Sequence, residues 1–483
     1  MPTILGANTL SSGFTVANSC RFDEGSSDHL NADSFGTPTS DKIYTLSWWF
    51  KRTKFGEAVY QFGWYDGSRT NSGDIVFDAG DTLSFYHGSD DGNGKLLMPN
   101  RLFRDPSAWT HVVWAVDTTQ GTASNRIKIY FNGVQETSFS TEVYPDQNAV
   151  SKIFHDSNNR IAAQWNAAGT TFYNGYMAEI VFIDGQQLTP TSFGEFDEDS
   201  PNIWKPIDVS DLTFGNNGFY LDFEDSSALG NDVSGNNNDF TVNNLTAVDQ
   251  STDTCTNNFC TLNPLNVPTS SGPTFSEGNL VSISTNANFG GSSTIGMTTG
   301  KWYCEAKCVT DATIRNAIGI TGETGELARD NNAPTASTSD QSSIGYLAEN
   351  GNKYNPAAGD NGSSYGNSYG NDDIIGIAMD LDNMKLYFSK NGTFQNSGDP
   401  TSGATGTGAI DITVAVADTI DGAYFVCQGS AGASTSRFDW NFGSPPYAVS
   451  SGNSDGNGHG NFEYSVPSGY LAWCTKNLGS DGG

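Results

Sequence analysis

The sequence lacks any long hydrophobic run. No stretch of the 483 residues approaches the roughly 20 consecutive apolar residues that a membrane-spanning helix needs. The first residues, MPTILGANTLSSGFTVANS, contain neither a basic segment nor an apolar core, and a secretory signal peptide has both. We therefore expect no signal peptide, no membrane insertion, and folding in the cytoplasm of the cell that makes the chain.

Basic residues are scarce. The chain has 23 Lys and Arg against 54 Asp and Glu, which gives a formal net charge of −31. Nucleic-acid binding requires a basic stripe that neutralises phosphates, so this charge disfavours a nucleic-acid partner. Two explanations of the acidic excess stay open, namely general solubility and carboxylate-rich loops that bind calcium.

Long stretches of helix-forming residues are also absent. Amphipathic helices are rich in Ala, Leu, Glu and Lys, whereas this chain has 12% aromatic residues and 55 Gly. Such a composition is typical of short strands joined by tight turns. The hydrophobic content of 36% is sufficient for a core in each half. We predict an all-β protein with more than one domain.

Cysteines are few and irregularly spaced. There are seven, and none forms a cluster with His at zinc-ligand spacing. Cys304 and Cys308 share one face of a predicted strand but lie roughly 13 Å apart, which is too far for a disulfide. Cys255 and Cys260 could close a small loop, and that pairing stays open. Buried thiols are the expected state, because cytoplasmic proteins rarely carry disulfides.

Alternating strand patterns fill the first half of the chain. The segments KIYTLSWWFKR, WTHVVWAVD, RIKIYFNGVQ and YMAEIVFIDGQ are rich in aromatic and β-branched residues. Asn132-Gly133 is a strong hairpin signal, and Thr189-Pro190 predicts the start of a short helical turn. This density of antiparallel strands predicts a two-sheet sandwich over residues 1–205.

Residues 206–270 change character and consist of turns with short extended pieces. We predict a packed connector, with a strand pair that bridges the domains as the alternative. Its apolar side chains should lie against a neighbouring domain, since a purely polar linker would not need them. These side chains are Phe219, Leu221, Phe223, Phe240 and Leu245.

The second half contains a meander of short strands. The segment DDIIGIAMDLDNMKLYFSKNGT alternates apolar and small residues and includes a second Asn-Gly turn, Asn391-Gly392. A second antiparallel sandwich is therefore predicted over residues 271–445. The Gly-rich segment 446–483 ends in YSVPSGYLAWCTKNL, and these apolar residues predict that it packs on a domain or a partner.

Several segments resemble known families. FTVANSCRFDEGSSDHLNADS, YTLSWWFKR, WTHVVWAVD, IKIYFNGVQ and YMAEIVFIDGQQLTPTSFGEF are similar to a LamG-like, concanavalin-type jelly roll. DVSGNNNDFTVNNL, GKWYCEAKC, DIIGIAMDLDNMKLYFSKNGT and SVPSGYLAWCTKNL resemble the SPRY-containing half of phage and marine viral structural proteins. The resemblance covers nearly the whole chain, and the pairing of both patterns in one acidic chain is its more specific part.

This resemblance implies a bacteriophage virion protein of the fibre, tail or capsid-surface type, located on the virion surface. The function it implies is host-surface recognition, through glycan binding without catalysis. A passive capsid or tail decoration protein and a polysaccharide depolymerase are the alternatives. The implied partners are other virion proteins, a host cell-surface glycan, and further copies of the chain in a homo-oligomer, expected to be a trimer. Fold analogy alone does not fix function.

We expect no enzymatic activity. Glycan hydrolases on concanavalin-type folds carry paired acids on one strand face. Glu179 and Asp184 lie five residues apart in AEIVFID, so they face opposite sides of a strand. His111 is expected to be a packed sandwich histidine and not a base. No P-loop, nucleophile elbow or dinucleotide-binding fingerprint occurs in the required context.

The resemblance also implies a calcium site, because LamG-like domains often hold Ca²⁺ near a rim of the sandwich. Asp222 and Asp225 approach a turn in which Asp232 and Asn236 offer further oxygens. These four residues are the candidate metal ligands. Solvated loop acids with no metal are the alternative.

Carbohydrate sites commonly combine an aromatic platform with hydrogen-bonding groups. Trp64 and Tyr65 in FGWYDGS are expected to be exposed, as are Tyr365 and Tyr369 in the Gly/Ser-rich loop SSYGNSYGN. These four are the candidate carbohydrate-binding residues. Each could equally pack against its own loop or against a neighbouring subunit.

Overall fold

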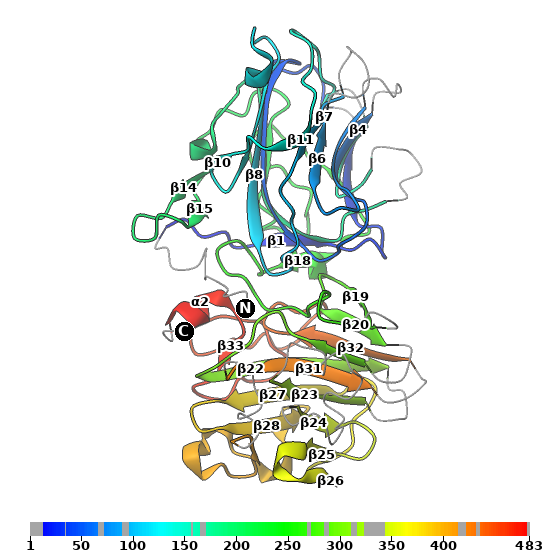
Figure 1. Ribbon diagram of the computed structural model, residues 1–483, viewed down its shortest axis with the longest axis vertical. Helices are drawn as coiled ribbons and strands as arrows, with labels where there is room; N and C mark the ends of the chain where they lie inside the picture. The colour runs from blue at the N-terminus through cyan, green and yellow to red at the C-terminus, as the bar shows by residue number, and fades with distance from the viewer. Residues whose placement is uncertain are drawn as a thin grey trace. The chain divides into compact units, whose positions relative to one another are not determined.

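The computed structural model contains two compact units, the first within Ala7–Asn258 and the second within Phe259–Gly483 (Figure 1). The residues that it describes are 13–33, 35–65, 72–88, 96–155, 158–164, 171–267, 272–284, 289–310, 316–322, 343–413, 422–430 and 435–480. Their regular structure consists mainly of antiparallel β-sheets, which confirms the predicted all-β class with two sandwiches. The described helical elements are short: η2 (Ala123–Asn125), η3 (Pro190–Ser192), η4 (Ala247–Asp249), η5 (Pro356–Ala358), η6 (Gln395–Ser397), η7 (Pro400–Thr405) and α2 (Thr475–Ser480).

One sheet of the first unit is built around its two longest strands. Its strands are β1 (Ser19–Phe22), β3 (Ile43–Arg52), β8 (Trp109–Asp117), β9 (Ile127–Phe131), β10 (Val134–Gln135), β13 (Gly175–Asp184), β16 (Phe219–Leu221) and β18 (Gln250–Ser251). Their order is β10-β9-β8-β3-β13-β1-β18, and β16 pairs with β13. Each neighbouring pair is antiparallel.

The second sheet of this unit completes the sandwich. Its strands are β2 (His29–Ala32), β4 (Val59–Tyr65), β5 (Gly73–Phe77), β6 (Leu83–Tyr86), β7 (Leu96–Pro99), β11 (Phe139–Glu142), β12 (Asn158–Ile161) and β17 (Thr241–Asn243). The order is β11-β7-β6-β5-β4-β12-β2-β17. A separate hairpin joins β14 (Gly194–Phe196) to β15 (Trp204–Pro206).

Strand β3 shows how the alternating pattern builds the core of this unit. Leu46, Trp48 and Phe50 point into the large cluster between the two sheets. The intervening residues face the other way, yet Trp49 and Lys51 are also buried. The core between the two sheets covers only the inner face of this sheet. Because side chains on its outer face are also buried, other residues must pack against that face.

Residues 206–258 supply that cover, so the first unit extends well past residue 205 to Asn258. Val209, Phe214 and Tyr220 pack against the outer face of β8 and β13, and Cys255 packs beside Trp49. The five apolar residues noted in this segment lie in the main core of the unit to which the segment itself belongs, and not against a neighbouring domain. They are Phe219, Leu221, Phe223, Phe240 and Leu245.

Two turns of the first unit confirm expectations from the sequence. Asn132 and Gly133 have φ values of 47° and 78° and connect β9 to β10 in a two-residue hairpin. Both residues thus occupy the left-handed region that favours Asn-Gly. The short 3₁₀ turn that Thr189-Pro190 predicts is also present, with Pro190 as its first residue.

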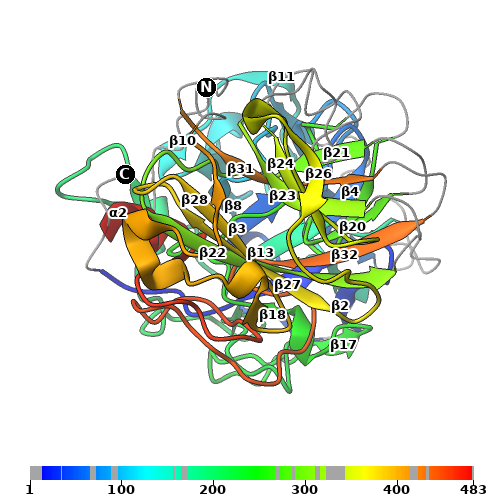
Figure 2. The ribbon, with the colours of Figure 1, turned by 90° about the horizontal axis from the view of Figure 1, so that it is seen from below.

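The second unit is another sandwich of two antiparallel sheets (Figure 2). The strands of its larger sheet are β19 (Thr274–Ser276), β20 (Val281–Ser284), β22 (Lys301–Thr310), β27 (Ile374–Asp380), β28 (Lys385–Lys390), β29 (Thr393–Phe394), β30 (Ile410–Asp411), β32 (Ser436–Asn441) and β33 (Leu471–Ala472). The order is β19-β20-β32-β22-β27-β28-β29, with β30 paired to β28 and β33 paired in parallel to β22.

The facing sheet of the second unit has the order β21-β31-β23-β24-β25-β26. Its strands are β21 (Phe289–Ser292), β23 (Asn316–Thr321), β24 (Ile344–Leu347), β25 (Asn352–Asn355), β26 (Asp360–Ser364) and β31 (Phe425–Ser430). The predicted meander is confirmed in the larger sheet, where β27 pairs with β28 and the Asn391-Gly392 turn leads into β29.

The C-terminal segment covers the outer face of the larger sheet in the second unit. Tyr470 and Phe462 are buried in a cluster with Tyr303 and Tyr387, which project from β22 and β28. Trp473 packs in the main core of the unit. The apolar residues at this end of the chain are therefore buried within the second unit.

The carboxylate of Glu305 fixes this segment to β22. It accepts hydrogen bonds from the backbone N–H groups of Glu463 at 3.0 Å and Tyr464 at 2.9 Å. The hydroxyl of Tyr303 donates a further bond at 3.1 Å. Burial raises the pKa of Glu305 to about 7, although these hydrogen bonds oppose the shift.

All seven cysteines are buried free thiols, so Cys255 and Cys260 do not form a disulfide in this structure. Among the described residues, no helix combines the length and the apolar character that crossing a bilayer requires.

Candidate functional site

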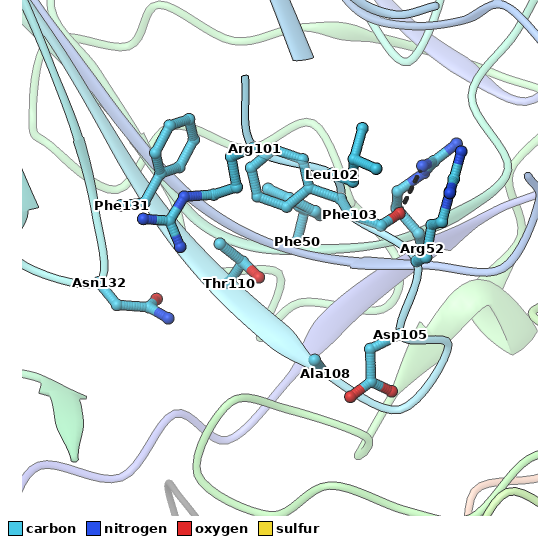
Figure 3. A pocket seen from close by; sticks show the side chains of 11 residues that line it. Phe50, Arg52, Arg101, Leu102, Phe103, Asp105, Ala108, Thr110, Phe131 and Asn132 are labelled. Carbon is cyan, nitrogen blue, oxygen red and sulfur yellow. Dashed lines mark hydrogen bonds between the residues drawn. The ribbon is translucent and has the colours of Figure 1, made fainter. Parts of the chain in front are cut away.

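The first unit contains a surface hollow of about 180 Å³, and Figure 3 shows the side chains that line it. It is bounded by the ends of β3, β8 and β9 and by the segment that connects β7 to β8. Its lining residues are Phe50, Arg52, Arg101, Leu102, Phe103, Arg104, Asp105, Ala108, Thr110, Phe131 and Asn132. All of them belong to one unit and to the described part of the chain.

Pairing of the strands sets the floor of the hollow. Phe50 of β3 lies opposite Thr110 of β8, and Phe131 of β9 lies opposite Val112. Phe50 and Phe131 belong to the core between the two sheets. The floor is therefore the open end of the sandwich core, held in place by two ladders of backbone hydrogen bonds.

Phe103 closes that open end. Its ring contacts the rings of Phe50, Phe77 and Phe131, at centroid distances of 5.6, 5.7 and 5.1 Å. The adjacent Leu102 is 49% exposed, so one large apolar side chain remains on the rim. The run RLFRD, in which charged residues flank two apolar ones, thus places aromatic carbon beneath a polar edge.

Asp81 organises two of the three arginines. Its carboxylate contacts Arg52 at 3.2 Å and Arg104 at 2.9 Å, and Arg52 also donates to the carbonyl of Phe103 at 2.7 Å. The buried Arg52 guanidinium lies 4.0 Å from the ring centroid of Phe77. Burial alone would raise the pKa of Asp81, but its hydrogen bonds and the neighbouring arginines hold that pKa below its ordinary value.

Arg101 and Asn132 provide hydrogen-bond donors on one side of the hollow, as Figure 3 shows. Arg101 is half-exposed, uses Nε to contact Glu136 at 3.3 Å, and lies over the ring of Phe131 at 5.4 Å. The Oδ1 of Asn132 accepts the backbone N–H of His111 at 2.8 Å. This bond fixes the amide orientation, and Nδ2 faces away from the strand as a donor.

Asp105 provides an acceptor on another part of the rim. One of its oxygens accepts from the backbone N–H and the hydroxyl of Ser107, at 2.8 and 2.6 Å. It is the only carboxylate among the lining residues. The hollow therefore combines an apolar wall, donors and one acceptor, an arrangement suited to binding a small polar ligand with an apolar face.

The predicted exposure of the aromatic candidates is wrong for three of the four. Trp64, Tyr365 and Tyr369 are 1%, 4% and 3% exposed, and only Tyr65, at the end of β4, is partly exposed. Trp64 contacts the ring of Trp114 inside the first unit at 5.9 Å. The alternation of β4 places it in the core, so its ring face is not available to a sugar.

Tyr365 and Tyr369 are buried because their loop folds back over the second sandwich. The hydroxyl of Tyr369 donates to the carbonyl of Tyr346 at 2.9 Å, and the hydroxyl of Tyr365 accepts the backbone N–H of Phe388 at 3.1 Å. The four rings form one aromatic cluster. The sequence could not show this, because a Gly/Ser-rich loop carries no periodicity.

The four predicted calcium ligands do not form one site. Asp232 accepts from the N–H groups of Tyr220, Ser234 and Asn238 and from the Ser234 hydroxyl. Asp222 and Asp225 each accept in a local turn of their own.

The amide nitrogen of the fourth candidate, Asn236, donates to the carbonyls of Gly215 and Gly218. These side chains stabilise separate turns, and the described residues contain no cluster of three or more His, Cys, Asp or Glu that could hold a metal ion. The prediction that these four residues converge on one cation is wrong, because each of the three carboxylates accepts hydrogen bonds within its own turn and the Asn236 amide donates to two backbone carbonyls.

Glu179 and Asp184, which were predicted to face opposite sides of their strand, make hydrogen bonds to different residues. Glu179 lies at a β-bulge of β13 with φ of 50° and accepts from the Tyr220 hydroxyl at 2.7 Å. Asp184 accepts the N–H groups of Thr39 and Asn217 at the end of the strand. Burial raises the pKa of Glu179 to about 8, although the Tyr220 hydrogen bond opposes the shift.

His111 is a packed histidine. It lies between the rings of Trp49 and Trp204, and its ring nitrogens bond to the Ser47 hydroxyl and the Trp204 indole N–H. Burial lowers the pKa of His111 to about 3, so the ring is neutral.

The residues of the hollow are not among the binding residues predicted from the sequence. The usable signal is RLFRD at 101–105, because two arginines that flank apolar residues are unusual in so acidic a chain. The contribution of Asn132 could not be found this way, since its Asn-Gly turn is explained by the hairpin alone.

The comparisons with known proteins define the class of each unit. Residues 24–191 match the family model of the Concanavalin A-like lectin/glucanases superfamily. Residues 301–422 match the family model of the SPRY domain. The chain therefore carries an N-terminal LamG-like concanavalin-type domain and a C-terminal SPRY domain. A search of curated proteins finds no match.

Solved structures with similar folds include proteins of diverse origin. One is the SPRY domain of human HERC1, with 16% identity, a TM-score of 0.25, and coverage of 33% of this chain and 87% of that chain. A second, from Bacteroides ovatus, is described as a candidate carbohydrate-binding protein and has 14% identity, a TM-score of 0.34 and coverage of 48% and 59%. A third is a heptameric SAP-like pentraxin from Limulus polyphemus, with 15% identity, a TM-score of 0.27 and coverage of 37% and 80%.

Proposed function

We propose that this chain is a glycan-binding protein without catalytic activity and that the hollow of its LamG-like domain is the binding site. The observation that carries the proposal is the combination in one hollow of an aromatic wall with donors and an acceptor from Arg101, Asn132 and Asp105. Sugar rings present apolar C–H faces together with hydroxyl groups, so they require both kinds of contact. The absence of catalysis is supported by the single carboxylate of the hollow, because glycan hydrolysis normally uses two.

Binding of the full-length chain to a panel of immobilised oligosaccharides tests this function. We expect at least one glycan to bind, and the Leu102→Ala and Asp105→Asn variants to weaken that binding several-fold. Leu265→Ala is the matched control, since Leu265 is also an exposed leucine, at 52%, but lies in the other domain. Unchanged binding by both hollow variants would overturn the site, and release of new reducing ends would overturn the non-catalytic role.

We further propose that the protein acts on a virion surface in host attachment, together with other virion proteins and as a homotrimer. The support is the pairing of a LamG-like with a SPRY-like pattern in one acidic chain. Competition for adsorption by the purified protein, and sedimentation analysis of its mass, test the two parts. Normal adsorption in excess protein would contradict the first part, and a monomer at micromolar concentration would contradict the second.

Passive decoration of a capsid or tail is a second candidate function. The observation that favours it is the burial of Tyr365 and Tyr369, which removes the candidate recognition surface of the SPRY domain. Particles that lack the protein would then lose heat stability but keep their adsorption rate. The opposite outcome, normal stability with slow adsorption, would leave the attachment function alone.

A further inference from the structure

The hollow contains an unusual concentration of positive charge for this chain. Three arginines line it, although acidic residues outnumber basic ones by 54 to 23 in the whole sequence. Arg52 and Arg104 share one carboxylate, that of Asp81. Asp81 balances one of these two guanidiniums, while the third arginine, Arg101, is paired with Glu136, and Asp105 is a further carboxylate on the rim.

Solvent screens the charge of Arg52 only weakly, because this side chain is buried. The Arg52 side chain is 1% exposed, and among the described residues its Nε and Nη2 atoms have no hydrogen-bond partner. Its guanidinium lies between the rings of Phe77 and Phe55, 4.0 and 4.7 Å from their centroids. A cation held among aromatic rings keeps more of its field than one in water.

Arg101 and Asn132 offer the contacts that an anionic group would use. Arg101 engages its protein partner, Glu136, through Nε, which leaves both Nη groups directed toward the hollow side that Asn132 shares (Figure 3). The Nδ2 of Asn132 is a donor there because its Oδ1 is held by His111. A planar guanidinium beside an amide N–H fits the two oxygens of a carboxylate.

We propose that the hollow selects acidic saccharides and receives the carboxylate of a hexuronate residue between Arg101 and Asn132. This inference rests on the proposed glycan-binding function and adds the chemical class of the ligand. The apolar face of the sugar ring lies toward Phe103 and Leu102, and the Asp105 carboxylate accepts from ring hydroxyls. The overall charge of −31 would repel such ligands elsewhere on the chain, so selection depends on this local site.

Matched pairs of ligands test the inference on the full-length protein. The probes are oligosaccharides of galacturonate, mannuronate and glucuronate polymers, each beside its carboxyl-reduced form, which keeps the sugar backbone and loses the charge. We expect at least one acidic form to bind on the order of 10- to 100-fold more tightly than its reduced form by calorimetry, as a charged hydrogen bond predicts. Its affinity should also fall with added salt.

Three variants test whether the preference for the acidic form depends on Arg101 and Asn132. Arg101→Gln should lower the affinity for the acidic form to that of the reduced form and leave the reduced form unchanged. Asn132→Asp keeps the oxygen that holds His111 but replaces the donor with a negative charge, so it should weaken the acidic form at least as much. Arg437→Gln, which removes an ion-paired arginine of the second unit, should change neither affinity.

The outcomes separate the inference from the function on which it rests. Equal affinity for the acidic and reduced forms, or an unchanged affinity in Arg101→Gln, overturns the acidic-sugar assignment and leaves glycan binding intact. Binding of a sulfated neutral saccharide without any hexuronate overturns the carboxylate assignment. Failure of every saccharide to bind overturns both proposals together. Thermal melts of the variants that match the parent exclude misfolding as the cause.

Discussion

The ammonium of Lys51 lies 2.7 Å from a carboxylate oxygen of Asp253, and both side chains are almost completely buried. Lys51 also donates to the side-chain oxygen of Asn258 at 2.7 Å, and the Trp109 indole donates to Asp253 at 3.1 Å. One buried ion pair therefore ties the long strand β3 to the end of the segment that covers the outer face of its sheet.

Breaking that pair should be costly. Lys51→Met leaves the Asp253 carboxylate buried without its cation, and we expect the free energy of unfolding of the N-terminal unit to fall by about 3–5 kcal/mol. Denaturant titration followed by tryptophan fluorescence measures the loss. Lys128→Met, at a partly exposed position of β9, is the matched control and should cost less than about 0.5 kcal/mol. An equal loss of unfolding free energy in Lys51→Met and Lys128→Met would contradict a stabilising role for the Lys51–Asp253 ion pair.

The raised pKa of Glu179 predicts a pH-dependent stability. The folded pKa of about 8 lies above the ordinary value of 4.5, so the folded state holds the proton more tightly than the unfolded state. This contribution to stability is fully present below about pH 4.5 and is lost as the pH rises to about 8. Glu179→Gln has no proton to lose, so its melting temperature should fall less than that of the parent between pH 5 and 8.

Melting curves at several pH values check this expectation. Asp225→Asn is the control, since that exposed carboxylate has a lowered pKa caused by the hydroxyl and N–H of Ser227. If Glu179→Gln and the parent lose stability in parallel between pH 5 and 8, Glu179 is not the group responsible.

Glu305 should control how firmly the C-terminal segment is held on the second sandwich. Both of its oxygens accept backbone N–H groups, and Glu305→Gln replaces one acceptor with a donor that opposes such a group. We expect a loss of about 1–3 kcal/mol and faster hydrogen exchange at Glu463 and Tyr464. Exchange measured by mass spectrometry reports this directly, with Glu349→Gln, at an exposed turn, as a control that should leave the segment protected.

Tyr365 and Tyr369 should be important for stability. Tyr365→Ala removes a buried ring from the aromatic cluster and should cost about 3–5 kcal/mol, whereas Tyr369→Phe removes the bond to the Tyr346 carbonyl and should cost about 0.5–1.5 kcal/mol. Tyr65→Ala, at a partly exposed position, should cost less than Tyr365→Ala. Glycan affinity of the folded variants should be unchanged, and a selective loss of binding by Tyr369→Phe would restore a recognition role.

The sequence predicted the local features of the fold well because these depend on neighbouring residues. Alternation in KIYTLSWWFKR marks β3, and Asn132-Gly133 and Asn391-Gly392 each mark a turn that needs positive φ. Long-range features were missed for the opposite reason. Nothing local shows that Phe214 and Tyr220 cover a sheet whose central strand begins at Ile43.

The candidate site was harder to predict than the fold. Aromatic residues near glycines were expected to be exposed, but Tyr365 lies under its own loop. Removing an aromatic ring from water lowers the free energy of the folded state, so burial is favoured over exposure. The hollow depends instead on Arg101, Asp105 and Asn132, which come from two separate connections. Only the pairing of β8 with β9 brings those connections together.

The cover formed by residues 206–258 also determines when the first unit can finish folding during its synthesis on the ribosome. Strand β18 and the Lys51–Asp253 pair join residues of the first unit that are separated by more than half its length. The sandwich cannot be completed until Asn258 has left the exit tunnel, and the outer face of β3, β8 and β13 stays uncovered during that interval. Slow translation through this stretch, or a fragment that stops at residue 205, therefore presents chaperones with a sheet whose second face still lacks its partner.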